Sequence, residues 1–226
     1  MREVQGKGMK ILYEDNHVIG VVKPFNLLSQ KDKTGDEDIM DRVKAYLKEK
    51  YHKPGNVFLG LVHRLDRPAG GVMVFARTSK AAGRLARQFR EKTMEKRYVA
   101  WVEGVVEEKE YTKAVSYIKK NPRSNKVTVF PSPAPDSLKA ELLYRAVRQE
   151  EGKTLLEITL LTGRPHQIRA QMAFLGHPVL GDLKYGAAEP LKGKNIALFS
   201  RYLAFEHPVT QEEIVLEAEP EEGWSG

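Results

Sequence analysis

The sequence predicts an α+β fold with a mixed, largely antiparallel sheet and flanking helices. Strand-like runs outnumber helical ones and often follow one another directly, which favours antiparallel pairing. Two longer segments show the 3.6-residue spacing of amphipathic helices. With 226 residues, of which 41% are hydrophobic and 30% charged, the chain is long enough to bury a core and has the composition of a globular protein.

The first half of the chain is predicted to alternate short strands with two helices. Residues 39–47 carry apolar side chains at helical spacing. An acidic run at 36–38 precedes them, where a helix dipole favours negative charge; a metal site is the alternative interpretation of this run. The second helix opens at Thr78, a good N-cap residue. The strands expected here are 10–14, 18–22, 57–62, 72–76 and 97–104.

The second half is predicted to form mostly strands. Residues 119–137 are rich in Pro, Ser, Lys and Arg and predict loops around a short strand. Gly152 lies between two alternating runs and predicts a hairpin. A short helix begins at Pro165, a favoured first helical position, and ends at Gly176. The strands expected here are 126–130, 138–147, 153–161, 195–205 and 213–218.

Positive charge is concentrated in the body of the chain. The net charge is +7, from 37 Lys and Arg against 30 Asp and Glu. Seven of the acids and none of the basic residues follow position 205, so residues 1–205 carry +14. No linker divides this body, and we expect a short extension at 1–9, one domain at 10–218 and an acidic tail at 219–226. A body this basic attracts polyanions, of which nucleic acid is the commonest in a cell.

Several functional classes leave no trace in the sequence. The chain has 0 cysteines, which excludes a disulfide framework, a thiolate metal site and a cysteine nucleophile. It lacks a phosphate-binding P-loop, a serine nucleophile elbow, a paired-histidine zinc motif and a dinucleotide fingerprint, so we expect neither cofactor nor metal. No run approaches the roughly 20 apolar residues of a membrane span, and no signal peptide is recognisable; we expect a cytoplasmic protein without a membrane partner.

Asp66 lies at a strand end, among other charged and polar residues. His63, Arg64 and Arg67 surround it, and a Pro-Ala-Gly-Gly turn follows. A carboxylate flanked by arginines stays ionised even when partly buried, as a nucleophile or an electrostatic stabiliser must. The alternative is an aspartate that caps the turn and pairs with a neighbouring arginine.

A second basic segment lies where a loop enters the short helix. Arg164 and Arg169 are five residues apart across this transition. Two guanidinium groups beside helix N-terminal amides form a phosphate-binding corner. A solvated basic helix start is the alternative interpretation.

These segments resemble the RluA-type pseudouridine synthases. The run His63-Arg64-Leu65-Asp66-Arg67, followed by Gly71, is similar to the catalytic motif of that family. The resemblance covers about residues 10–218. Further similar stretches occur in the family's order at 12–15 with 22–24 and 27–29, at 96–100, at 162–164 with 166–169, at 176–178 with 180–182 and 185–186, and at 205 with 207–208.

The resemblance implies a catalytic domain that isomerises uridine to pseudouridine in structured ribosomal or transfer RNA. It implies no metal, no cofactor and no protein partner. Asp66 matches the family's essential carboxylate, Arg169 the arginine that pairs with it, and Tyr98 the tyrosine that packs on the target base. Arg64 matches the residue that fills the place of the flipped base. The residues expected to bind substrate are His63, Arg64, Arg164, Ile168 and Lys23.

The sequence departs from the family pattern in three places, one of which is Leu198-Phe199-Ser200 where relatives often carry Leu-His-Ala. Ala69 and Gly70 stand where relatives usually carry hydroxyl side chains, and a lost hydrogen bond there could weaken the loop. Residues 1–9 leave no room for the S4-like RNA-binding domain of many relatives.

Arg84, Arg87 and Arg90 recur at helical spacing and are candidates for contacts with RNA phosphates. The alternative interpretation is that they form an ordinary solvated helix face. The other functions left open are an inactive RNA-binding module and a metal-dependent nuclease using Asp32, Asp36, Asp38 and Asp41.

Overall fold

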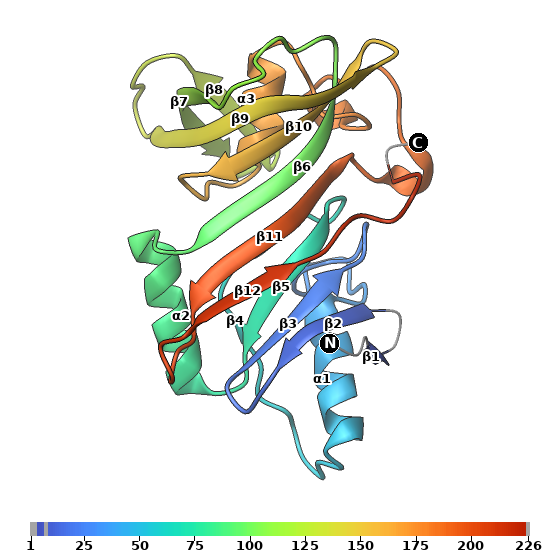
Figure 1. Cartoon of the computed structure of the whole chain (residues 1–226), viewed down its shortest axis with the longest axis vertical. Helices are drawn as coiled ribbons and strands as arrows, with labels where there is room; N and C mark the ends of the chain where they lie inside the picture. The colour runs from blue at the N-terminus through green and yellow to red at the C-terminus, as the bar shows by residue number, and fades with distance from the viewer. Residues whose placement is uncertain (1–3, 7–8, 225–226) are drawn as a thin grey trace. The chain divides into compact units, whose positions relative to one another are not determined.

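The computed structural model describes residues 4–6 and 9–224 and separates the chain into two units. Unit 1 consists of Met1–Lys96 and Ser200–Pro220, and unit 2 of Arg97–Phe199 and Glu221–Gly226. Helices and mostly antiparallel strands form both units, which confirms the predicted α+β class (Figure 1). No helix in the described part of the chain is long and apolar enough to cross a membrane.

The sheet of unit 1 is built around the antiparallel pair β3 and β5. Val18 pairs with Ala76 at one end of this pair and Lys23 with Gly71 at the other. All seven residues of β5 are buried, which explains its continuous apolar run. The strands involved are β1 (Val4–Gly6), β2 (Met9–Glu14), β3 (Val18–Lys23), β4 (Gly60–Leu61), β5 (Gly70–Ala76), β12 (Glu213–Glu217) and most of β11 (Leu198–Glu206).

Two capped helices, α1 (Ile39–Lys50) and α2 (Ser79–Glu91), belong to unit 1, as predicted. The Asp38 side chain accepts a hydrogen bond from the Asp41 N–H at 2.7 Å and so begins α1. Thr78 does the same for α2 through the Ala81 N–H at 3.1 Å. The buried face of α2 packs against β5 and β4 and includes Leu85. The acidic run before α1 thus acts as a helix start.

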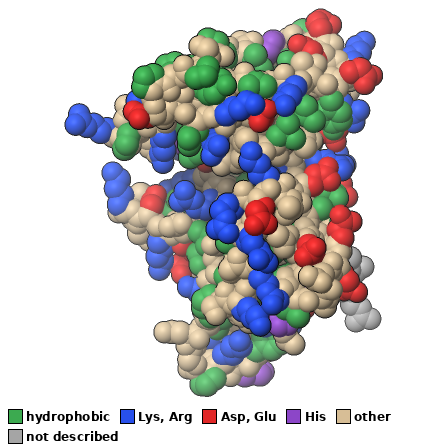
Figure 2. Space-filling model, turned by 90° about the vertical axis from the view of Figure 1, so that its left-hand side faces the viewer, with side chains coloured by type: hydrophobic (Ala, Val, Ile, Leu, Met, Phe, Trp, Pro, Cys, Tyr) green, Lys and Arg blue, Asp and Glu red, His purple; other side chains and the backbone are tan. Residues whose placement is uncertain are grey.

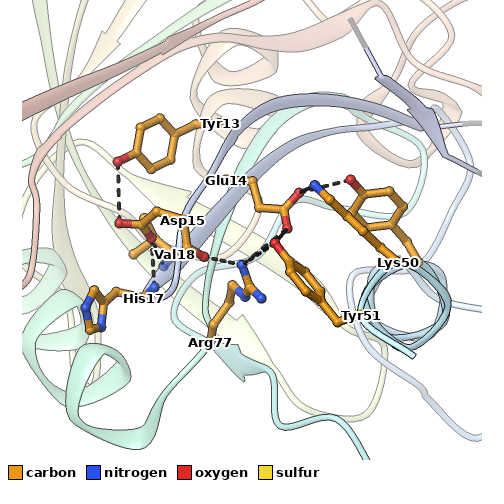
Figure 3. A network of polar contacts seen from close by, with 9 residues as sticks. Tyr13, Glu14, Asp15, His17, Val18, Lys50, Tyr51 and Arg77 are labelled. Atoms are coloured by element: carbon orange, nitrogen blue, oxygen red, sulfur yellow. Dashed lines mark hydrogen bonds and ion pairs between the residues drawn. The ribbon is translucent and has the colours of Figure 1, made fainter. Parts of the chain in front are cut away.

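A polar network fixes the turn between β2 and β3 against the end of α1 (Figure 3). Glu14 accepts hydrogen bonds from Lys50 at 2.7 Å and Tyr51 at 2.6 Å, and it pairs with Arg77. Burial would raise the pKa of Glu14, but these donors outweigh burial and hold the pKa below its ordinary value. The Asp15 carboxylate caps the turn itself by accepting hydrogen bonds from the backbone N–H groups of His17 and of Val18, the first residue of β3.

Unit 2 is a meandering antiparallel sheet with one helix packed on it. The strand order is β6-β10-β9-β7-β8. Helix α3 (Gln167–Phe174) contacts β7 and β8, and Ala170 shares a core cluster with Ile118 and Val127. The strands are β6 (Glu95–Glu103, which begins in unit 1), β7 (Thr112–Asn121), β8 (Lys126–Phe130), β9 (Leu138–Glu150) and β10 (Lys153–Leu160).

The structure differs from the predicted elements in a few places. The strand expected at 57–62 is reduced to Gly60–Leu61, and β7 was not predicted. Helix α3 begins two residues later than expected because His166 has a left-handed backbone, with φ at +51°. Strand β1 falls inside the segment expected to be an extension, of which residues 1–3 and 7–8 lie outside the described residues.

Candidate active site

The loop that carries Asp66 is held at its start by Ser29. The loop joins β4 to β5, with Leu65 buried and Asp66 half-buried. The Ser29 hydroxyl donates to the Leu65 carbonyl oxygen at 2.6 Å and accepts from the Leu65 N–H at 3.1 Å. The Ala69 N–H donates to the Asp66 carbonyl oxygen at 3.1 Å, which closes a turn. The backbone is therefore fixed directly before and after Asp66.

Lys23 supports the same loop from beneath. Its side chain is fully buried, and its ammonium group donates to the carbonyl oxygens of Pro24 at 3.0 Å, Leu27 at 2.7 Å and Arg67 at 3.2 Å. Burial lowers the pKa of Lys23 to about 7, against the opposing effect of the Asp66 charge. The ammonium group thus ties the Asp66 loop to the end of β3, so Lys23 supports this loop. The contact between Lys23 and substrate stays a prediction.

The turn after Asp66 closes without hydroxyl side chains. Ala69 is buried and supplies only its backbone N–H. Gly71, which follows, has φ at +123°, and a Cβ there would lie 2.4 Å from the backbone N and O atoms of Ser200. Only glycine fits this position, because any side chain would meet the backbone of β11. The sequence left open whether the loop is weakened by the lack of hydroxyl side chains at Ala69 and Gly70. In the structure, backbone contacts stabilise the loop instead.

His63 and Arg64, neighbours in sequence, lie in different surroundings. The His63 ring stacks on Phe89 of α2, with centroids 4.7 Å apart, and its Nε2 accepts from the Val74 N–H at 3.0 Å. Burial lowers the pKa of His63 to about 3, so the ring is neutral and acts as an acceptor. Arg64 is exposed. His63 therefore joins the loop to the sheet, while Arg64 is available to a large substrate.

The aspartates considered for a nuclease have local partners. Asp38 caps α1, and Asp36 pairs with Arg67 at 2.7 Å. Among residues 4–6 and 9–224, no group of three or more His, Asp or Glu side chains could hold a metal ion. The remaining two aspartates are engaged by Lys31, for Asp41, and by Thr34, for Asp32.

The three predicted α2 arginines do not share one environment. Arg84 donates to the Pro208 carbonyl oxygen and is half-buried. Arg87 and Arg90 are exposed, as is Lys80. Lys and Arg side chains gather on the face of the molecule shown in Figure 2. Any phosphate contact by α2 therefore falls to its exposed basic residues, because Arg84 anchors the helix.

In unit 2, Tyr98 and Ile168 are buried residues of β6 and α3. Tyr98 pairs across the sheet with Ile158 of β10, and 9% of its surface is exposed. Ile168 is 4% exposed and lies in the first turn of α3. Their contact with the target base stays a prediction.

Gln167 organises the loop that leads into α3. Its side-chain oxygen accepts from the Thr162 hydroxyl at 2.8 Å and from the Arg164 N–H at 3.0 Å. The Arg164 guanidinium donates through Nε to the Lys139 carbonyl oxygen at 3.0 Å, so it is tied to β9. The second arginine motif is thus a structured turn, with the buried Gln167 at its centre.

Arg169 is buried and held by a carboxylate. Its Nε lies 2.6 Å and its Nη2 2.8 Å from the two carboxylate oxygens of Asp182. Its guanidinium also lies over the Tyr185 ring, 5.2 Å from the centroid. The Tyr185 hydroxyl in turn hydrogen-bonds His166 Nδ1 at 2.8 Å. The motif around Arg169 and the stretch from 181 to 186 therefore form one cluster.

The predicted residues fall into two groups, one in each unit. Unit 1 brings Lys23 and His63 together with Asp66 around one loop, while unit 2 carries Tyr98 and Arg169. The pairing of Asp66 with Arg169 stays a prediction. Ser29 and Asp182 were noticed in the sequence only as parts of similar stretches, without a role. In the sequence, each is only a small polar residue among apolar neighbours. The structure shows that both are buried, and a buried polar side chain needs a hydrogen-bond partner.

Residues 17–174 match the RNA pseudouridylate synthase family, and the chain belongs to that family. The chain is therefore an RNA pseudouridine synthase, and members of this family are isomerases. It is 31% identical to tRNA pseudouridine synthase C of Vibrio cholerae over 96% of this chain and 93% of that protein. It is 33% identical to the dual-specificity RNA pseudouridine synthase RluA of Pasteurella multocida, over 94% of this chain and 93% of that one.

Solved structures agree on the fold. Human RNA pseudouridylate synthase domain containing 4 aligns with 95% of this chain and 89% of its own, with a TM-score of 0.77 and 22% identity. Human RNA pseudouridylate synthase domain containing 1 aligns with 97% of this chain and 86% of its own, with a TM-score of 0.75 and 23% identity.

Proposed function

We propose that residues 10–218 form a catalytic domain that converts uridine to pseudouridine in structured transfer or ribosomal RNA, with Asp66 as the essential carboxylate. The C1′–N1 bond of the uridine breaks, the base turns, and C5 bonds to C1′. The proton lost from C5 is balanced by one gained at N1, so the product is an isomer. The observation that carries the proposal is the built support of Asp66, because its flanking backbone is fixed by Ser29, Lys23 and a closed turn.

The other site residues divide the remaining work. Tyr98 packs against the target base, and Ile168 forms an apolar floor beneath it. Arg169 pairs with Asp66 and keeps it ionised, because a guanidinium partner favours the charged carboxylate. A uridine inside folded RNA must leave its stack at a cost of a few kcal/mol. Arg64 is exposed and fills the vacated place by stacking or by bonding phosphate.

The net charge and the relatives both favour RNA as the substrate. Residues 1–205 carry +14, which suits a phosphate backbone. Similar proteins are named as a tRNA pseudouridine synthase, a dual-specificity RNA pseudouridine synthase and a ribosomal large subunit pseudouridine synthase. Mapping pseudouridines in cellular RNA with and without the gene would identify the position modified.

The decisive experiment is a pseudouridine assay on bulk RNA from the organism of origin, without added metal or nucleotide. The wild-type protein should form pseudouridine, and Asp66→Asn should not, because the amide keeps the shape of the side chain but removes its charge. Asp32→Asn, an exposed aspartate that accepts from Thr34, is the matched control and should stay active. Turnover by Asp66→Asn near the wild-type rate would overturn the assignment of Asp66.

A further inference from the structure

Arg169 occupies a position in α3 where a positive charge is unfavourable. His166 is the N-cap, so Arg169 is the third residue of the helix and lies beside the positive end of the helix dipole. Its side chain is only 6% exposed, so water does not compensate the charge. A buried arginine at this place requires a negative partner.

Asp182 is that partner, and its own backbone is fixed on both sides. Only 1% of its side chain is exposed. Its N–H donates to the Val179 carbonyl oxygen at 3.0 Å, and its carbonyl oxygen accepts from the Tyr185 N–H at 2.9 Å. Gly181 before it has φ at +79°, and a Cβ there would lie 2.7 Å from the Asn195 carbonyl oxygen. The carboxylate is therefore presented to Arg169 from a rigid turn.

The contact fixes the direction of the guanidinium as well as its charge. Asp182 takes up the edge formed by Nε and Nη2, and the guanidinium carbon lies over the Tyr185 ring, 5.2 Å from its centroid. Two hydrogen bonds to one edge set the direction of the opposite, Nη1 edge, because the guanidinium is planar and rigid. Buried ion pairs add little net stability compared with apolar packing, so stability alone is a weak reason for this one.

We propose that Asp182 is a positioning residue of the active site, which orients Arg169 toward the reacting carboxylate. The inference rests on the proposed function, because it requires Arg169 to act on Asp66. Asp182 itself touches no reacting atom in this scheme. Its effect on the rate should therefore disappear when Arg169 is absent.

A double-mutant cycle tests this dependence. Single-turnover rates at saturating RNA would be measured for Asp182→Asn, Arg169→Ala and the double variant, corrected for the folded fraction. Asp182→Asn should lower the rate roughly 100-fold, the loss typical of a slightly misplaced catalytic group, with unchanged RNA affinity. In the Arg169→Ala background, the same change should alter the rate by less than about threefold, because coupled residues are non-additive. A purely structural role would instead lower the melting temperature and leave the corrected rate intact.

Two further variants keep the test decisive. Glu157→Gln breaks a more exposed arginine–carboxylate pair in the same unit, with Arg145 Nη2 2.6 Å from the carboxylate, and should leave the rate unchanged. If Asp182→Asn does not fold, Asp182→Glu retains the charge while displacing the guanidinium, and its rate should still fall at least tenfold. A wild-type rate in the folded Asp182 variant, or an equal loss in both Arg169 backgrounds, would overturn the inference.

The proposed function can fail separately. If the wild-type protein forms no pseudouridine in any RNA, or if Asp66→Asn is fully active, the proposed function falls before Asp182 is considered. If those two results are as expected but Asp182→Asn turns over normally, only the positioning role is wrong. If Arg169→Ala is fully active, the role of Arg169 is wrong and the role of Asp182 falls with it.

Discussion

The loop around Asp66 and the turn around Arg169 are stabilised by different interactions. The Asp66 loop is held mostly through its backbone, by the Ser29 hydroxyl, the Lys23 ammonium group and the close approach at Gly71. Arg169 is held through its side chain, by a carboxylate and an aromatic ring. The difference is consistent with the roles proposed for the two groups. In the proposed scheme the carboxylate of Asp66 reacts, so its support comes from neighbouring residues, whereas an orienting arginine can give one edge to a permanent partner.

The largest expected effect comes from breaking the backbone support at Gly71. Gly71→Ala should lower the free energy of unfolding by more than about 4 kcal/mol, because the new Cβ would lie 2.4 Å from backbone atoms that cannot move aside. Gly152→Ala is the matched control, since Gly152 also has a positive φ but no atom within 4 Å of the added Cβ. It should lose only about 1 kcal/mol. Urea denaturation measures both, and equal losses would show that the close approach is unimportant.

The sequence predicted the Asp66 loop better than the Arg169 cluster, for a physical reason. The helices and most strands around Asp66 follow from local periodicity and turn residues, although the strand expected at 57–62 is only Gly60–Leu61. Strand β7 is hard to predict because three of its inward-facing residues, Thr112, Ala114 and Ser116, are small or polar, so its apolar alternation is faint. The pair of Arg169 with Asp182 joins residues 13 positions apart across a helix end and two turns. Such a contact depends on tertiary packing, which periodicity does not encode.

Removing each of two arginines should separate chemistry from base flipping. Arg169→Ala should lose roughly 100-fold in rate on a folded stem-loop and on a loosened RNA with an unpaired target, because it leaves Asp66 without its partner. Arg64→Ala should lose about tenfold on the folded RNA and less on the loosened one, where flipping costs little. Single-turnover rates on both RNAs give the comparison. Recovery of Arg169→Ala on the loosened RNA would reassign Arg169 to substrate positioning, and equal factors for Arg64→Ala would refute the flipping role.

The buried ammonium group of Lys23 should make the stability of unit 1 depend on pH. Its pKa is about 7 in the folded protein and returns to 10.5 on unfolding, so the unfolded chain binds more protons between these values. The Lys23 contribution to the free energy of unfolding should therefore rise with pH, by about 2 kcal/mol between pH 7 and 9. Urea denaturation of wild type and Lys23→Met at both pH values isolates this contribution as a difference. A difference that stays constant with pH would mean that the ammonium group is not desolvated.

The smallest expected effect is on the salt dependence of RNA affinity, and it tests whether α2 contacts the RNA backbone. Arg87 and Arg90 are exposed, whereas Arg84 donates to the Pro208 carbonyl oxygen. Arg87→Gln with Arg90→Gln should reduce the slope of log affinity against log salt by about 1 to 2, since each lost phosphate contact removes roughly 0.7 to 0.9. Arg84→Gln should lower the melting temperature and leave the slope unchanged, because its guanidinium is engaged within the protein. Affinity measured between 50 and 200 mM salt distinguishes the two, and a slope that falls with Arg84→Gln alone would assign the RNA contact to Arg84.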